Sequence, residues 1–207
     1  MSRLRMMFFS GVAASVAFPA VWLLLASERP VGGDLLKLTD PPSESAQSAQ
    51  FRAGNDPAVD VRTLADPREV GALLRLWGGS PGDGDSSLIS LPKEKWTGLG
   101  RPPGSKGYVF RDPAAAAGVR RVAIESAAAG GSLTIKAGGP AWPYRVTQPQ
   151  GLVTLTLQVG DDTFCARFSE FARNEARLVI AKKSESPVSC QPEACGNAIL
   201  ETAEDCD

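Results

Sequence analysis

Oxygen-bearing side chains gather near the C-terminus, over residues 195–207. This stretch contains no lysine, arginine or histidine, so no positive charge competes for its carboxylates. Ca²⁺ binds through oxygen ligands and tolerates irregular coordination, which makes it the metal ion that this chemistry suits best. The candidate side-chain ligands are Asn197, Glu201, Glu204 and Asp207, which lie between or just after Cys195 and Cys206.

The order of these residues resembles two known patterns. The run Cys195-Gly-Asn-Ala-Ile-Leu-Glu-Thr-Ala-Glu-Asp-Cys206-Asp207 resembles the start of the cysteine-rich repeat of myxobacterial surface proteins. It is also similar to the calcium turn that opens disintegrin domains. The disintegrin resemblance implies a calcium ion bound by Asn197, Glu201, Glu204, Asp207 and the carbonyl of Ile199. We expect residues 185–207 to be the start of such a repeat; the alternative is a solvated acidic tail.

Several function classes are excluded by composition. The chain has no histidine, which removes the commonest general base and rules out Ser–His and Cys–His catalysis. The glycine-rich segment 98–107 has the wrong spacing for a phosphate-binding loop, and its prolines lack backbone donors. A net charge of −1 gives no electrostatic footprint for nucleic acid. We therefore expect neither an enzyme nor a nucleic-acid partner.

The N-terminus is typical of an exported protein. Arg3 and Arg5 precede an apolar run from Met6 to Ala26. A positive start followed by an apolar run is the secretory pattern, and a run of this length can also span a bilayer. Residues 1–26 are predicted to form a hydrophobic helix that serves as a signal peptide or membrane anchor. The rest of the chain is then extracytoplasmic, either anchored to the membrane or secreted.

The four cysteines agree with an oxidising compartment. They are crowded into the last quarter of the chain, and none of their spacings is the C-x2-C typical of zinc sites. If Phe164, Ala166 and Phe168 face the core, Cys165 lies on the opposite face of its strand. A C-terminal tail that crosses this strand would then present Cys190 to it. We expect the pairs Cys165–Cys190 and Cys195–Cys206, although other pairings remain open.

The middle of the chain has the alternation of β-strands. Residues 27–57 are rich in Pro, Gly, Ser and Gln and are predicted to be a disordered linker. In residues 58–184, apolar and polar residues alternate in short runs separated by turns such as Gly130-Gly131 and Gly160-Asp161-Asp162. The core-facing residues are predicted to be Val153, Leu155, Leu157, Val159, Leu133, Ile135, Ala137, Val122, Ile124, Leu178 and Ile180. This predicts an all-β domain, an antiparallel sandwich or barrel.

One segment has competing signals. Asp66-Pro67-Arg68-Glu69 is a good start for a helix, and apolar residues continue at helical spacing to Trp77. The alternative is a strand from Ala72 to Trp77 that turns through residues 78–86 into a second strand ending at Leu91. The span 70–182 resembles an uncharacterised β-rich domain of deltaproteobacterial secreted proteins, through Leu91-Pro-x3-Trp96 and Gly104-Ser-Lys-Gly-Tyr-x-Phe-x-Asp112. This resemblance favours the strand.

Aromatic residues supply one candidate ligand site. Trp142 and Tyr144 follow a Gly-Gly-Pro turn, and flat aromatic rings on a surface are the means by which proteins stack on sugars. We therefore expect an extracytoplasmic structural or adhesive surface module, with a glycan or another surface protein as partner. The alternative is a carbohydrate-binding module that uses Trp142 and Tyr144.

Overall fold

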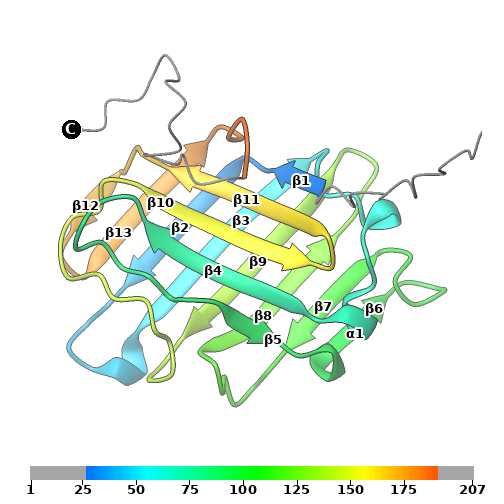
Figure 1. Ribbon diagram of the computed structural model, residues 1–207, viewed down its shortest axis with the longest axis horizontal. Coiled ribbons are helices and arrows are strands. Elements are labelled where there is room, and N and C mark those ends of the chain that lie inside the picture. The colour runs from blue at the N-terminus through cyan, green and yellow to red at the C-terminus, as the bar shows by residue number, and fades with distance from the viewer. Residues whose placement is uncertain (1–26, 191–207) are drawn as a thin grey trace, which may run out of the picture.

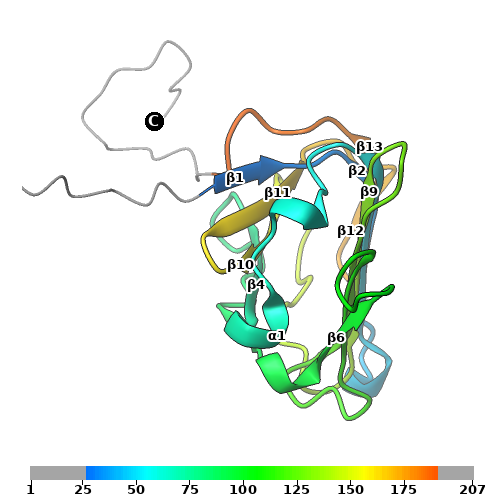
Figure 2. The same ribbon diagram turned by 90° about the vertical axis from the view of Figure 1, so that its right-hand side faces the viewer.

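A computed structural model describes residues 27–190, which form two β-sheets packed face to face (Figures 1 and 2). The predicted all-β class is confirmed, and of its two alternatives the structure is the sandwich, since the sheets do not close into a barrel. Almost all strand pairs are antiparallel; β1 and β11 pair in parallel. The predicted N-terminal helix, residues 1–26, lies outside the described residues. No helix within residues 27–190 is long and apolar enough to cross a membrane.

The smaller sheet has five strands in the order β1-β11-β10-β4-β5. Their bounds are β1 Ser27–Pro30, β4 Ala72–Gly78, β5 Ile89–Leu91, β10 Val153–Val159 and β11 Asp162–Phe168. The strand prediction for 72–77 and its turn into a strand ending at Leu91 are confirmed, because β4 and β5 pair as an antiparallel hairpin.

The larger sheet has eight strands in the order β12-β13-β2-β3-β9-β8-β7-β6. Their bounds are β2 Gly33–Thr39, β3 Ser48–Asp56, β6 Trp96–Leu99, β7 Gly107–Arg111, β8 Val119–Glu125, β9 Gly131–Gly138, β12 Arg173–Glu175 and β13 Leu178–Ser184. Most neighbours in this sheet are consecutive in sequence, but the β13–β2 and β3–β9 pairs join distant parts of the chain, as the colours of Figure 1 show.

Helical structure is confined to single turns. These are η1 Glu44–Ala46, η2 Val61–Thr63, η3 Lys93–Lys95 and α1 Pro67–Val70. The predicted helix start at Asp66 is confirmed, because its side chain accepts from the Arg68 amide and Pro67 is the first helical residue. Gly71 then adopts φ 71°, which an L-residue rarely takes, and ends the helix. The apolar residues that follow belong to strand β4.

The core lies between the inner faces of the two sheets. The alternation predicted for β10 and β9 is confirmed, since Val153, Leu155, Leu157, Leu133 and Ile135 are all buried. Phe51 of β3 and Phe168 of β11 meet across the core, edge to face, with ring centroids 6.1 Å apart. Such contacts hold the sheets together mainly by removing apolar surface from water.

The predicted linker at 27–57 is wrong. These residues form β1, β2 and β3, and β2 and β3 lie in the middle of the larger sheet. Leu36, Leu38 and Phe51 are almost fully buried. Residues 27–57 are therefore part of the folded domain. The small inward residues Ala49 and Ala53 weaken the apolar alternation of β3, which is why the pattern was missed.

The inward face of β13 was also assigned incorrectly. Val179 and Ala181 are fully buried, whereas the predicted inward residues Leu178 and Ile180 are half-buried on the outer face. A shift of one residue reverses every side chain of a strand, because the side-chain period is two. The larger residues Leu178 and Ile180 misled the prediction, and the smaller Val179 and Ala181 fit the packed interior.

Candidate functional site

The predicted calcium ligands lie outside the described residues. They are Asn197, Ile199, Glu201, Glu204 and Asp207, and Cys195 and Cys206 lie there as well. Within residues 27–190, no three Asp, Glu or Cys side chains gather in a way that would hold a metal ion. Calcium binding by the C-terminal segment therefore stays a prediction.

The predicted disulfide Cys165–Cys190 is confirmed, with its two Cα atoms 5.3 Å apart. Cys165 lies on the outer face of β11, opposite to its core-facing neighbours Phe164 and Ala166. The backbone amide of Cys190 donates to Oε2 of Glu28 in β1, at 2.9 Å. Ser27, Glu28, Cys165 and Cys190 thus form one corner of the molecule, hereafter the attachment corner, where both ends of the described chain are fastened to β11.

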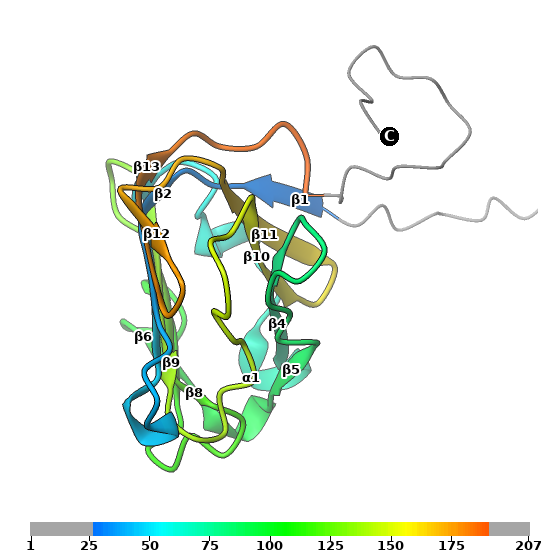
Figure 3. The same ribbon diagram turned by 90° about the vertical axis from the view of Figure 1, so that its left-hand side faces the viewer.

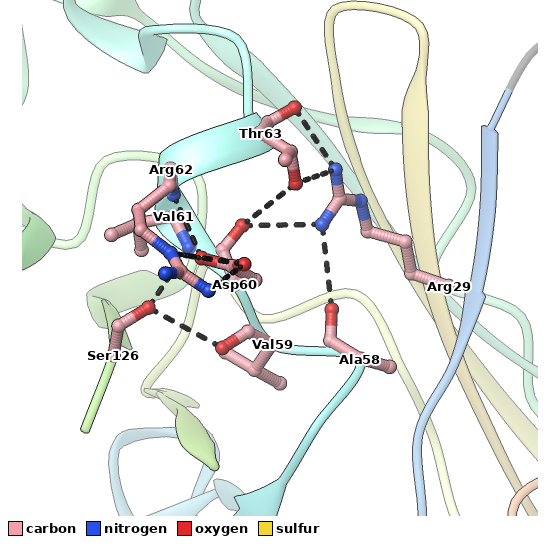
Figure 4. A network of polar contacts seen from close by, with 8 residues as sticks. All are labelled: Arg29, Ala58, Val59, Asp60, Val61, Arg62, Thr63 and Ser126. Atoms are coloured by element: carbon pink, nitrogen blue, oxygen red, sulfur yellow. Dashed lines mark hydrogen bonds and ion pairs between the residues drawn. The ribbon is translucent and has the colours of Figure 1, made fainter. Parts of the chain in front are cut away.

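Arg29 fastens β1 further, as Figure 4 shows for its contacts with the 58–63 loop. Its Nε donates to Oδ1 of Asp162 at 2.8 Å, and these two side chains are only 11% and 10% exposed. Its Nη1 donates to the carbonyls of Ala58 and Asp60, and its Nη2 donates to the carbonyl and hydroxyl of Thr63. Because its donors are used by the protein itself, Arg29 is a structural residue that ties an edge strand to a loop.

The loop that Arg29 holds is fixed at its other side as well (Figure 4). The amide of Val61 donates to Oγ of Ser126, which follows β8. The side chain of Arg62 donates to Asp60, and this hydrogen bond lowers the pKa of Asp60 to about 2. The 58–63 loop therefore links an edge of the smaller sheet to the larger sheet, and its charged groups are already paired.

The described surface has several shallow clefts. One, of about 440 Å³, lies beside α1 and β5. Its charged lining residues are Lys93 and Glu94, and the rest of its lining is neutral, including Val70 and Leu73. The other polar side chains of its lining are Ser90 and Gln158, and Glu94 is its one carboxylate, so this cleft lacks the pair of facing carboxylates that glycoside hydrolysis uses.

The expectation that Trp142 and Tyr144 form an exposed pair is wrong. They are only 5% and 1% exposed, because the connection between β9 and β10 runs down the opening between the two sheets (Figure 3). The hydroxyl of Tyr144 donates to Gln150 at 2.8 Å, and burial raises the pKa of Tyr144 above its usual value. These rings close one side of the core and offer no face to a sugar.

The outer face of the smaller sheet carries an arginine, Arg75, whose charge is paired with a carboxylate. Arg75 of β4 lies 4.9 Å from the ring centroid of Trp77, and it donates twice to the carboxylate of Asp85. The Arg75 hydrogen bond holds the pKa of Asp85 below its usual value. Thr154 and Thr156 of β10 lie beside Trp77 and Arg75.

The sequence analysis missed a concentration of positive charge on the outer face of the larger sheet. Lys37, Lys136, Arg121 and Arg111 belong to β2, β9, β8 and β7 and fall in one row across the strands. A net charge of −1 conceals this separation of charge. The sequence could show that Lys136 points outward, because it alternates with the apolar Ile135 and Ala137. It could not show which residues lie beside Lys136 on the adjacent strands, because that depends on the strand order.

No protein-family model, no curated protein and no solved structure matches this chain.

Proposed function

We propose that this chain is a structural or adhesive module of a bacterial envelope or secreted protein, placed outside the cytoplasm and without catalysis. The attachment corner carries this proposal. Residue 27, which follows the predicted export segment, and residue 190, which lies within the predicted start of the cysteine-rich repeat at 185–207, are fastened to the same strand. Because both ends of the described chain are attached at the smaller sheet, the outer face of the larger sheet stays available for contact with a partner.

The disulfide supports the proposed compartment. Disulfides persist in oxidising environments and are rare in the reducing cytosol. Cys165 and Cys190 join elements that are far apart in sequence and leave no described cysteine reduced. The apolar run before residue 27 and the acidic segment after residue 190, which we propose to bind calcium, fit the same placement.

The alternative function, a carbohydrate-binding module that stacks sugars on Trp142 and Tyr144, is not supported by the burial of these two rings. A stacking platform needs aromatic faces open to solvent. We therefore retain the structural or adhesive module and do not assign a sugar site to these residues.

The compartment is tested on the full chain in its source cells. Cells are fractionated after thiols are blocked, and peptides are mapped without reduction. We expect the Cys165–Cys190 peptide pair in the envelope or secreted fraction, and we expect labelling of exposed Lys136 by an amine reagent that does not cross the inner membrane. A cytosolic marker protein that stays unlabelled is the control. Reduced Cys165 and Cys190 in the cytosolic fraction would overturn the proposal.

A further inference from the structure

Positive side chains form a straight row across the larger sheet. Strand registers place Lys37 opposite Gln50, Gln50 opposite Lys136, Lys136 opposite Arg121, and Arg121 opposite Arg111. We call these five residues, four cations and the neutral Gln50 between Lys37 and Lys136, the basic row. They occupy five adjacent strands, β2-β3-β9-β8-β7, and neighbouring strands lie about 4.8 Å apart. The row therefore extends over roughly 19 Å of rigid backbone.

An irregularity in β8 adds a further cation. The β8–β9 register shifts between Val119 and Arg121, so the extra residue Arg120 stands beside Arg121. Arg120 is exposed, whereas Val119 and Val122 on either side of the two arginines are buried. Bulges of this kind re-aim side chains and are frequent next to binding sites. Two consecutive arginines are thus directed away from the core between Lys136 and Arg111 of the basic row.

These cations have almost no carboxylate partners in the protein. Arg121 has a single distant partner, Glu125, at 4.0 Å. Asp112 follows Arg111 in sequence, but its side chain is buried and accepts from Lys95 at 2.7 Å. Within residues 27–190, Lys37, Lys136, Arg111 and Arg120 have no carboxylate within ion-pair distance. The row is therefore a strip of uncompensated positive charge.

Such an arrangement works against the stability of the sheet. Like charges directly opposite each other on adjacent strands repel, and here Arg121 faces both Lys136 and Arg111. A polyanion laid along the row would neutralise this repulsion, and its binding would be favoured further by release of its counterions. We propose that the basic row binds a linear acidic polysaccharide through its carboxylate or sulfate groups.

The rest of this face favours a polysaccharide over the other polyanions. Peripheral binding to an anionic bilayer needs apolar side chains that insert. The large apolar residues exposed within residues 27–190 are Val70, Leu73, Leu88 and Val188, and none of them lies in the larger sheet, where the outer residues Leu178 and Ile180 are half-buried. Single-stranded nucleic acid is bound by exposed aromatic rings, but Trp96, Tyr108 and Phe110 of β6 and β7 are buried. The ligand class rests on the proposed function, because acidic matrix glycans lie outside the cytoplasm.

The test measures binding of the purified full chain to immobilised alginate at several salt concentrations. The test variant is Lys136→Gln/Arg111→Gln, in which both exposed side chains keep their length approximately. We expect it to lower affinity about tenfold or more at low salt, and to reduce the slope of log affinity against log salt by about two. Neutral dextran should not bind to either protein.

A matched control removes two positive charges elsewhere. Lys93→Gln/Arg62→Gln lies in η3 and η2, outside the larger sheet, and should bind alginate as the unaltered chain does. Absence of alginate binding by the unaltered chain, or equal loss in both variants, would overturn the assignment of the basic row. Tighter binding of duplex DNA or of phosphatidylglycerol vesicles than of alginate would overturn the assignment to a polysaccharide. Neither result bears on the compartment, which the thiol mapping measures separately.

Discussion

The outer faces of the two sheets differ in whether their positive side chains have partners within the protein. On the smaller sheet, Arg75 is paired with Asp85 and lies against Trp77, and at its edge Arg29 is paired with nearly buried Asp162. On the larger sheet, Arg52 and Arg173 are paired with Asp34 and Glu175, but the cations of the basic row stand side by side with only the distant Glu125 beside Arg121. Both faces belong to one domain of nearly neutral sequence, so their difference arises from where the strands place each charge.

This contrast separates charges that hold the fold from charges that are available to a ligand. A cation surrounded by the protein's own acceptors has its hydrogen bonds satisfied and gains little from an outside anion. Where two cations face each other, binding of an outside anion reduces the repulsion between them. The smaller sheet with its attachment corner is accordingly the side that fastens the domain, and the larger sheet is the side available for binding.

The largest effect is expected at Arg29. Replacing it in Arg29→Met leaves the carboxylate of Asp162 buried without its counter-charge, and breaking such a pair costs about 3 kcal/mol or more of unfolding free energy. Urea unfolding measures the loss. Arg62→Gln is the matched control: its side chain is 82% exposed, and we expect a change below about 0.5 kcal/mol. Equal effects of the two variants would remove the distinction between the buried ion pair of Arg29 and the exposed ion pair of Arg62.

Removal of the disulfide should have a slightly smaller effect. Cys165 and Cys190 are separated by 25 residues, and closing a loop of this size stabilises by about 3 kcal/mol through the entropy of the unfolded chain. The double variant Cys165→Ala/Cys190→Ala is compared with the oxidised chain by thermal unfolding. Its affinity for alginate should be unchanged, because the basic row belongs to the other sheet. A parallel loss of binding would show that the two faces are coupled.

Acid should reduce the stability that the paired carboxylates contribute, whereas the cations of the basic row keep their charge. The pKa of Asp60 is lowered to about 2 by Arg62, and that of Asp85 is lowered by Arg75. A folded-state pKa below the unfolded value gives stability that is present at neutral pH and is lost as pH falls. For Asp60 this loss falls between about pH 4 and pH 2. Because Arg75 lowers the pKa of Asp85, unfolding measured as the pH falls from neutrality should be less steeply pH-dependent in Arg75→Gln than in the unaltered chain, and an identical profile would contradict it.

The smallest effect is a gain in stability. Lys136→Thr removes a charge that faces Arg121, and relief of this repulsion should raise the unfolding free energy by about 0.5 kcal/mol at low salt. The gain should disappear at high salt, where exposed charges are screened. Thermal unfolding at two salt concentrations measures it. A loss of stability at low salt would mean that Lys136 has a structural role.

The strands that the sequence predicted correctly are those whose two faces differ most. In β10, branched apolar residues alternate with Thr154, Thr156 and Gln158, so the pattern has a single interpretation. In β2, three apolar positions include the adjacent pair Leu35 and Leu36, which hides the alternation, and glycines and prolines nearby suggest a linker. Local composition alone could not show that β2 is held between β13 and β3.

The same reasoning explains which parts of the site were foreseen. Cys165 could be placed from the alternation within one strand, and Cys190 from the path of the chain that follows it. The basic row depends on the order β2-β3-β9-β8-β7, which joins segments from residue 33 to residue 138. Trp142 and Tyr144 were misplaced because a Gly-Gly-Pro turn normally leads to the surface, whereas here the chain after it fills the gap between the sheets.

The disulfide at the attachment corner also determines how tension would travel through the domain. A pull on residue 27 enters β1, and a pull on residue 190 enters β11 directly through Cys165. The mechanical load would therefore fall on this one pair of strands and on the Arg29 contacts. The rest of the sandwich, including the whole larger sheet, would stay unloaded while the ends are stretched.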